Sequence, residues 1–306
     1  MKYRMQPIGK INDIPIFSTP DRYIDNYDKI AKDHLESLAE SGHNPFIQDT
    51  VWSDLEKSTT ELMAKYLKPG ETIFDAGVGL GRLLAGFPNH PRYGADISMA
   101  YLEVARKEGI DVIISKLEEL PYENDSFDMV VCTDVLEHVF DLHGSLVQLV
   151  RVVRPGGTII IRVPFEEDLQ PYHEYKEYDF VHLRRFDLYG TRLLLEKIYQ
   201  MEYLEHSLHN PIYRGQSTSY LNFMEDAKSL GKLLDKLPAD VEGLPALIDA
   251  TKLNRNEFET LMNRIATDHP IIFSKIVDLV AKPLEMNIVF RKPVAGSNLN
   301  EARGPL

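Results

Sequence analysis

The stretch Asp75-Ala-Gly77-Val-Gly79-Leu-Gly81 lies where a short apolar strand at residues 72–75 turns into a helix that begins at Arg82. Glycines at such a turn adopt backbone dihedral angles that a Cβ atom would forbid, and they let the chain approach a ligand closely. Asp96 ends the next predicted strand, where a carboxylate can accept hydrogen bonds from both hydroxyls of a ribose. Together these features indicate a site for a ligand that contains a ribose.

Strands and helices alternate along the chain around this turn. The predicted strands lie at residues 72–75, 93–96, 112–114, 127–132, 158–163, 203–209 and 285–290. Neighbouring parallel strands need crossover connections, so the alternation predicts an α/β fold with a doubly wound, mostly parallel seven-stranded sheet. The Val/Ile runs within it are continuous, as is typical of strands buried on both faces.

The same pattern divides the chain into segments. Residues 1–50 are predicted to form an N-terminal helical cap, and residues 51–213 with 284–293 form the core. About seventy residues before the last strand have helical spacing, which is too many for a loop. We therefore expect residues 214–283 to be a helical insertion that serves as a lid or dimer interface, and residues 294–306 to be a flexible tail.

Composition and charge exclude several classes of protein. The 306 residues include 34 Lys and Arg against 47 Asp and Glu, which gives a net charge of −13. This acid excess argues against binding to duplex nucleic acid, because phosphate contacts need clustered basic side chains. Cys132 is the single cysteine, so an internal disulfide and a cysteine-rich zinc site are both excluded. With no secretory signal and no membrane-spanning run, a soluble cytoplasmic protein is expected.

Two kinds of ligand compete for the glycine-rich turn. A nicotinamide cofactor favours the spacing G-x-G-x-x-G, whereas this chain has G-x-G-x-G directly preceded by an acidic residue. Residues 111–141 also hold many carboxylates, with Lys116 as the lone lysine or arginine. Such a surface would repel a pyrophosphate and attract a cation, which favours a positively charged ligand.

Four motifs together resemble the class I S-adenosylmethionine-dependent methyltransferases, in the branch that acts on small molecules. They are DAGVGLGRLL (75–84), GADIS (94–98), SKLEELPYENDSFDMVVCTDVLEHV (115–139) and RVVRPGGTIIIRVP (151–164). The resemblance covers about residues 50–210 and the last strand, and it implies S-adenosylmethionine as the cofactor.

The resemblance also implies which residues hold that cofactor. Asp75 would fix the loop or the ammonium group of the methionine part, Asp96 would hold the ribose, and Ile97 would pack on the adenine. The remaining implied contacts are Gly77, Gly79 and Gly81 under the methionine part, Lys116, Leu117 and Glu118 at the adenine edge, and Thr133, Asp134 and Val135 beside the reacting methyl group. Many relatives have Asp in place of Lys116, and a lysine cannot accept a hydrogen bond from adenine.

The substrate side is expected to contain histidines. His138 and His182 are candidate general bases. The alternatives are that His138 is a cap or packing residue and that His182 belongs to a structural turn with residues 184–186. His173, Tyr172 and Tyr175 are candidate substrate contacts. A metal site built from His173, Glu174, Glu177 and His182 matches no compact ligand motif, so no metal is predicted.

The predicted function is in-line transfer of a methyl group to an oxygen or nitrogen of a small molecule, such as a sugar, a natural product or another metabolite. The expected partners are that substrate and, through the helical insertion, a second copy of the chain; neither nucleic acid nor a membrane is expected. Two alternatives remain open: a non-catalytic cofactor-binding protein with this fold, and an NAD(P)-dependent oxidoreductase.

Overall fold

The computed structural model describes residues 2–174, 176–209 and 283–294, together with 260, 264, 266–271 and 273. The chain divides into two compact units, one of Met1–Leu208 with Glu285–Leu306 and one of His209–Leu284. Most of the predicted helical insertion and nearly all of the predicted tail lie outside the described residues. None of the described helices is long and apolar enough to span a bilayer.

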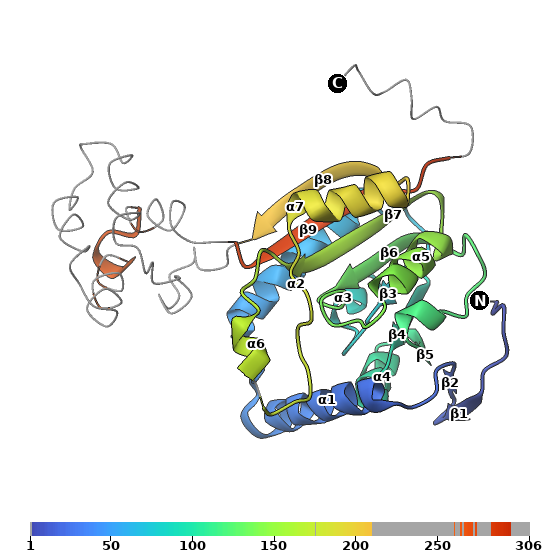
Figure 1. Cartoon of the computed structure of the whole chain (residues 1–306), viewed down its shortest axis with the longest axis horizontal. Helices are drawn as coiled ribbons and strands as arrows, with labels where there is room; N and C mark the ends of the chain where they lie inside the picture. Colours follow the sequence, from blue (N-terminus) through green and yellow to red (C-terminus); the bar gives the residue numbers. More distant parts are fainter. Residues whose placement is uncertain are drawn as a thin grey trace, which may run out of the picture. The chain divides into compact units, whose positions relative to one another are not determined.

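The first unit is built on a nine-stranded sheet with the order β1-β2-β5-β4-β3-β6-β7-β9-β8 (Figure 1). The strands are β1 (Gly9–Ile11), β2 (Ile14–Ile16), β3 (Ile73–Ala76), β4 (Arg92–Asp96), β5 (Asp111–Ile114), β6 (Phe127–Thr133), β7 (Val153–Pro164), β8 (Glu202–His209) and β9 (Glu285–Arg291). Pairing is parallel from β2 through β7, and β9 runs antiparallel to β7. The prediction of a mostly parallel α/β sheet is confirmed.

Two strands were missing from the sequence prediction, which gave seven strands and a helical segment over residues 1–50. Strands β1 and β2 form a hairpin around Asn12 and Asp13, whose φ angles are +49° and +63°. Two residues with positive φ are the signature of a tight hairpin turn, and Asn and Asp tolerate that conformation best after glycine. Ile16 then pairs with Ile114, which adds the hairpin to the sheet edge.

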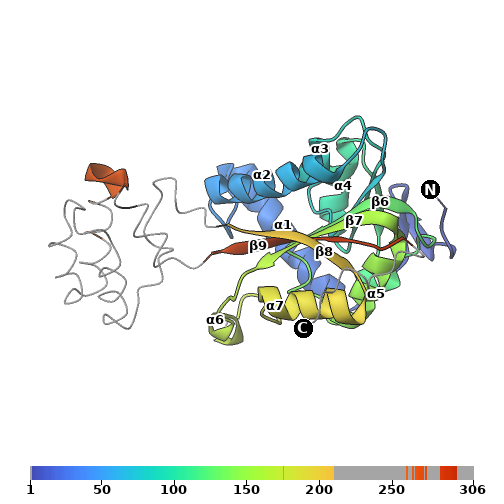
Figure 2. The same cartoon turned by 90° about the horizontal axis from the view of Figure 1, so that it is seen from above.

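Helices cover both faces of the sheet. Figure 2 shows α2, α3 and α4 on one face, with α5 and α7 on the other. The helices are α1 (Arg22–Ser41), α2 (Asp49–Tyr66), α3 (Arg82–Ala85), α4 (Met99–Lys107), α5 (Leu142–Val152), α6 (Gln170–Glu174) and α7 (Leu188–Arg192), with a 3-10 turn η1 (Leu117–Glu119) and a π-helical turn η2 (Leu193–Ile198). Arg82 at the start of α3 forms a two-point ion pair with Glu56 of α2, which joins these helices.

The core lies on both sides of the central strands. Along β7, Ile159 and Ile161 belong to one apolar cluster and Ile160 to the cluster on the opposite face, all three fully buried. This confirms that the continuous apolar runs are strands covered on both faces. Strand order reverses at β3, which has β4 on one side and β6 on the other. In such sheets a ligand binds beyond the carboxyl ends of the strands at this point of reversal.

Candidate active site

The glycine-rich loop between β3 and α3 combines tight packing with open space. Gly77 has φ +96°, and a Cβ atom there would lie 2.2 Å from Cγ2 of Val135. Gly79 has φ +49°, and a Cβ atom there would meet nothing within 4 Å. Gly81, with φ +77°, immediately precedes α3. Packing against the residues after β6 therefore demands glycine at position 77, whereas position 79 borders space that the protein leaves open.

Asp96 holds this loop in place from the end of β4. Its Oδ2 accepts a hydrogen bond from the backbone N–H of Gly79 at 2.9 Å, and its Oδ1 accepts one from the N–H of Ser98 at 2.9 Å. Burial nevertheless raises the pKa of Asp96. Each carboxylate oxygen has a second lone pair, so two hydroxyls of a ribose can still donate to Asp96. Ile97, the predicted adenine contact, is partly exposed beside it.

Asp75 lies at the base of the loop with an unmatched oxygen. The residue is only 2% exposed, and its Oδ1 has no hydrogen-bond partner. Burial raises the pKa of Asp75 well above its usual value, and the nearby carboxylates of Asp96 and Asp134 raise it further. A buried acceptor without a donor is costly. The ammonium group of a methionine moiety would supply both the missing donor and a compensating charge, so the residues present fit this cofactor.

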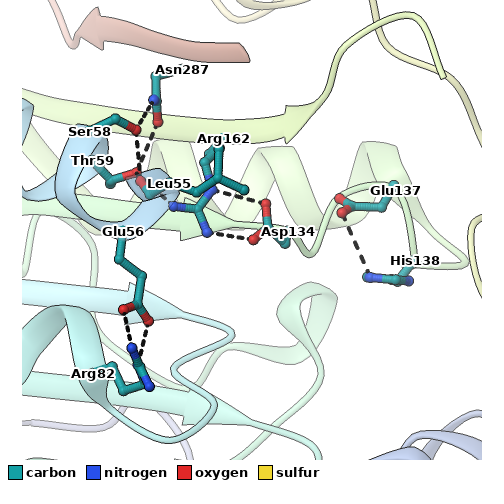
Figure 3. A network of polar contacts seen from close by, with 10 residues as sticks. All are labelled: Leu55, Glu56, Ser58, Thr59, Arg82, Asp134, Glu137, His138, Arg162 and Asn287. Carbon is teal, nitrogen blue, oxygen red and sulfur yellow. Dashed lines mark hydrogen bonds and ion pairs between the residues drawn. The ribbon is translucent and has the colours of Figure 1, made fainter. Parts of the chain in front are cut away.

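A buried arginine holds Asp134, which adopts φ +55° directly after β6. Arg162 of β7 donates to both carboxylate oxygens of Asp134, from Nε at 3.0 Å and from Nη2 at 2.5 Å. The same guanidinium donates to Thr59 of α2, which in turn donates to Asn287 of β9 (Figure 3). Arg162 was not among the predicted site residues, although an arginine within an apolar strand is unusual and indicates a buried partner.

The predicted adenine-edge residues have varied roles in the structure. Lys116 forms an ion pair through Nζ with Asp21, the N-cap of α1, so its charge is already matched. Leu117 packs in the core, and Glu118 is partly buried. Thr133 ends β6 and is buried, and Val135 contacts the glycine loop. The cofactor contacts of these residues stay a prediction.

The two candidate bases are brought together by the segment that follows α6. The N–H of Leu183 donates to the carbonyl of Glu137 at 2.9 Å, and Arg184 donates to the carbonyl oxygens of Leu136, Val139 and Phe140. These bonds fasten residues 182–184 to the turn after β6. As a result the ring of His182 lies 4.7 Å from that of His138.

Helix α1 supports the same segment from the other side, a role that the prediction of a cap did not include. Asn26 donates to the carbonyl of Phe180 and accepts from the N–H of Asp179, each at 2.9 Å. The hydroxyl of Tyr27 donates to the carbonyl of Val181 at 3.0 Å. Asn26 is buried beside Tyr23 on α1, and a buried polar side chain needs a partner. That burial is evident only in the folded chain.

The hydrogen bonds of the two histidines fix where their ring protons lie. Nδ1 of His138 is 3.1 Å from the carbonyl oxygen of Val181, so it must carry the proton. Nδ1 of His182 is 2.5 Å from Oε2 of Glu167, whose Oε1 accepts from the hydroxyl of Tyr172 at 2.7 Å. Burial and the adjacent His182 ring lower the pKa of His138 to about 3. His138 is therefore neutral, with a lone pair on Nε2.

Glu137 lies beside these rings and is almost fully buried, at 1% exposure. Neither carboxylate oxygen has a hydrogen-bond partner, and Oε1 is 3.7 Å from Nε2 of His138. Burial raises the pKa of Glu137 well above its usual value, and the charge of Asp134 raises it further. Among the described residues, Glu137, His138 and His182 form the one group of metal-ligating side chains, with ligand atoms within 4.8 Å of one another.

The other predicted substrate residues differ in their distance from this group. Tyr172 contacts His182, with ring centroids 4.6 Å apart and the ring planes tilted by 38°. His173 is exposed, and it is not a member of the group that could share an ion. Tyr175 and the side chain of Glu174 lie outside the described residues. His138 lies before α5, which begins at Leu142, in a turn where its N–H donates to the carbonyl of Val135.

Comparison with known proteins adds independent evidence. Residues 74–161 match the family model described as a methyltransferase domain. An uncharacterized methyltransferase of Schizosaccharomyces pombe is 30% identical over 174 residues, which cover 49% of this chain and 61% of that protein. A tRNA (carboxymethyluridine(34)-5-O)-methyltransferase of Arabidopsis thaliana is 33% identical over 100 residues, 32% of this chain and 25% of that protein.

A solved structure extends the similarity of fold. In the complex of the Haloferax volcanii Trm112 methyltransferase activator, the methyltransferase partner superposes with a TM-score of 0.56 at 18% identity, over 89% of this chain and 98% of that one. This chain spans only between 25% and 64% of the length of the curated relatives it matches. The matched residues include the glycine loop, Asp96 and the strands that carry them. Residues 74–161 therefore carry a methyltransferase domain, and the site around Asp75 and Asp96 fits S-adenosylmethionine as its cofactor.

Proposed function

We propose that this protein transfers the methyl group of S-adenosylmethionine to an acceptor held beside Glu137, His138 and His182. The observation that carries the proposal is the loop tied to Asp96, with the unmatched Asp75 carboxylate beneath it. The bound cofactor supplies a methyl group on a positively charged sulfur. The carboxylates of Asp75, Asp96 and Asp134 interact with one another in this region, and a cation relieves their repulsion.

Positioning carries most of the catalysis in this proposal. The acceptor oxygen forms its bond to the methyl carbon as the carbon–sulfur bond breaks, and the sulfur keeps the electron pair. Holding the two reactants in line can supply about 7–11 kcal/mol of the barrier reduction. The chain provides this through the glycine loop on the donor side and the fastened segment 182–184 on the acceptor side.

His182 is the better of the two candidate bases. Its Nδ1 faces the Glu167 carboxylate, so Nε2 is free to accept the proton of an acceptor hydroxyl, and the carboxylate stabilises the resulting imidazolium. His138 is a weak base because its pKa is lowered to about 3. A positioned base of this kind contributes roughly 10²–10⁴-fold to the rate. Loss of the acceptor's proton to His182 favours a hydroxyl as the methylated group.

The proposed acceptor is a small molecule, and RNA is the second candidate. The net charge of −13 supports the first, since an RNA ligand needs basic contacts. The similarity to a protein named as a tRNA methyltransferase supports the second and weighs against the expectation of no nucleic acid. Incubation with radiolabelled cofactor and either total RNA or a metabolite extract separates them, because label in the RNA fraction alone would overturn the small-molecule proposal.

A matched pair of glycine variants tests the cofactor site. The methyl group of Gly79→Ala would enter the open space above the loop. Gly70→Ala is the control, because Gly70 also has a positive φ, +80° against +49° at Gly79, and equally open surroundings at a turn outside the site. Calorimetric titration with S-adenosylmethionine should show at least a tenfold loss of affinity for Gly79→Ala and none for Gly70→Ala. If the wild type binds no S-adenosylmethionine, or binds a reduced nicotinamide instead, the proposed function is wrong.

A further inference from the structure

We infer that Glu137, His138 and His182 form a binding site for one divalent transition-metal ion on the acceptor side of the proposed active site. The three side chains come from two segments that meet only in the folded chain, the turn after β6 and the segment after α6. Two imidazoles and one carboxylate form a set of ligands that suits first-row transition ions and leaves coordination positions open.

The free lone pairs converge in the way a metal ion requires. Because Nδ1 of His138 and Nδ1 of His182 both face acceptors, Nε2 is the nitrogen of each ring that can bind an ion. Ligand atoms about 2.0–2.2 Å from a shared ion lie at most about 4.4 Å apart. The separation of 3.7 Å between Glu137 Oε1 and His138 Nε2 already meets this limit. All the candidate atoms lie within 4.8 Å of one another, so a small side-chain rotation suffices to close the set.

The outer contacts of the two histidines are those that metal-binding histidines have. Such residues almost always donate their second ring N–H to a carboxylate or a backbone carbonyl, which fixes the tautomer and raises the basicity of the ligand nitrogen. His182 donates to the carboxylate of Glu167, and His138 donates to the carbonyl of Val181. Tyr172 in turn fixes Glu167 by donating to its second oxygen.

The state of Glu137 supplies independent support for a cation. A carboxyl group at 1% exposure with neither oxygen hydrogen-bonded needs a compensating charge or a proton. The surrounding groups add mostly negative charge, since Asp134, Glu167 and Glu285 all face this region. Arg162 is paired with Asp134, and Arg184 is bonded to backbone carbonyls. A divalent ion would satisfy Glu137 and offset the excess negative charge at once.

An ion at this position gives the proposed reaction a Lewis acid. An oxygen of the acceptor would fill an open coordination position, which lowers the pKa of its hydroxyl group and releases the proton to solvent. In the metal-bound protein His182 is then a ligand, and the ion replaces it as the group that activates the acceptor. This role depends on the proposed methyl transfer, whereas metal binding itself does not.

Metal titration tests the site directly. The 306-residue chain, without a tag, is treated with a chelator, dialysed and titrated by calorimetry with Mn²⁺, Co²⁺, Zn²⁺ and Mg²⁺ separately. We expect one equivalent of a transition ion to bind more tightly than Mg²⁺, and Co²⁺ to develop the visible absorption bands of a nitrogen- and oxygen-ligated ion.

Four variants separate this site from adventitious binding. Glu137→Gln and His182→Gln should lose at least 100-fold in affinity, and Glu167→Gln should lose about 10–100-fold, because it removes only an outer contact. His143→Gln, which changes a histidine bonded to Tyr199 outside the group, should bind as the wild type does. Absence of stoichiometric binding, or equal affinity in Glu137→Gln and the wild type, would overturn the inference. A chelated protein that still binds S-adenosylmethionine would leave the proposed function intact in that case.

Discussion

Tyr27 and His138 donate hydrogen bonds to the same backbone oxygen, the carbonyl of Val181, at 3.0 and 3.1 Å. Their rings also meet edge to face, with centroids 5.2 Å apart. Helix α1 thus helps to hold in place the carbonyl oxygen that accepts the proton of His138 Nδ1. A helix that the sequence places in a cap segment supports a residue of the candidate active site.

Tyr27→Phe tests this relationship. Removing one neutral hydrogen bond should lower the free energy of unfolding by about 1 kcal/mol. Affinity for S-adenosylmethionine should change less than twofold, because the hydroxyl faces the acceptor side, while turnover should fall. Tyr189→Phe, at a tyrosine that is 75% exposed, is the matched control and should change neither property. Equal turnover in both variants would show that α1 does not position His138.

Arg162→Met should be strongly destabilising, because it leaves buried Glu285 and the carboxylate of Asp134 without their cation. Loss of one partner of a buried ion pair costs roughly 3 kcal/mol or more. Arg154→Met is the control, since Arg154 pairs with Asp128 and Glu71 near the surface. Chemical denaturation should show that Arg154→Met lowers the free energy of unfolding by at most about 1 kcal/mol. Similar losses in the two variants would contradict the importance we assign to Arg162.

Glu137→Gln should stabilise the metal-free protein at neutral pH. The folded-state pKa of Glu137 is raised, so the native protein holds a proton that the unfolded chain releases, and stability falls as pH rises from about 4.5 toward the raised value. Gln does not titrate, so the stability of the variant does not fall in this way. Its free energy of unfolding should exceed that of the wild type by about 1–3 kcal/mol at pH 8 and should be almost the same at pH 4.5. Urea denaturation at both pH values measures the difference, and a destabilised variant at pH 8 would contradict it.

His34 should make stability fall in mild acid. Burial and the charge of Arg82 lower its pKa to about 4, so the folded protein keeps His34 neutral while the unfolded chain is protonated below about pH 6.5. Stability from this residue is present above pH 6.5 and is lost as pH falls toward 4. Urea denaturation should show that, relative to His34→Gln, the free energy of unfolding of the wild type falls by about 2 kcal/mol between pH 6.5 and pH 5. A constant difference across this range would show that His34 titrates normally.

Gly77→Ala and Gly79→Ala should differ in stability although both glycines have positive φ angles, +96° and +49°. The new methyl group at position 77 collides with Val135, so the loop or the turn after β6 must move, whereas position 79 has room. Overpacking typically costs about 1–3 kcal/mol, to be added to the positive-φ cost that both variants share. Thermal unfolding should therefore place Gly77→Ala clearly below Gly79→Ala. Equal midpoints would contradict the tight contact.

The central elements were predictable because their signals are local. Strands β3 to β7 are short apolar runs between turn residues, and the loop from Gly77 to Gly81 has an unmistakable composition. The hairpin at Asn12 and Asp13 was missed because its strands have only three residues each, too few to show a period. Its place in the sheet depends on Ile114, far away in the sequence.

The candidate site was predictable only in part, because some of its residues have local signals and others depend on contacts between distant segments. Asp75 and Asp96 follow strand ends, where local sequence reveals them. Glu137 was counted only among the acids of a charged region, and Glu167 was not considered. Their roles arise when Arg184 and Asn26 fasten a distant segment against the turn after β6. Such contacts join residues more than 40 positions apart, and no pattern within one segment records them.

Strand β9 occupies an interior position of the sheet, between β7 and β8, yet it is made after the whole of the second unit. During synthesis on the ribosome, β7 therefore has an open apolar edge until residues 285–291 emerge. Asn287 of the same strand also adds an acceptor for the Thr59 hydroxyl and a donor to the Ser58 hydroxyl. Unpaired strand edges are prone to join other chains. A nascent chain of this protein accordingly needs protection for the time in which the second unit is translated.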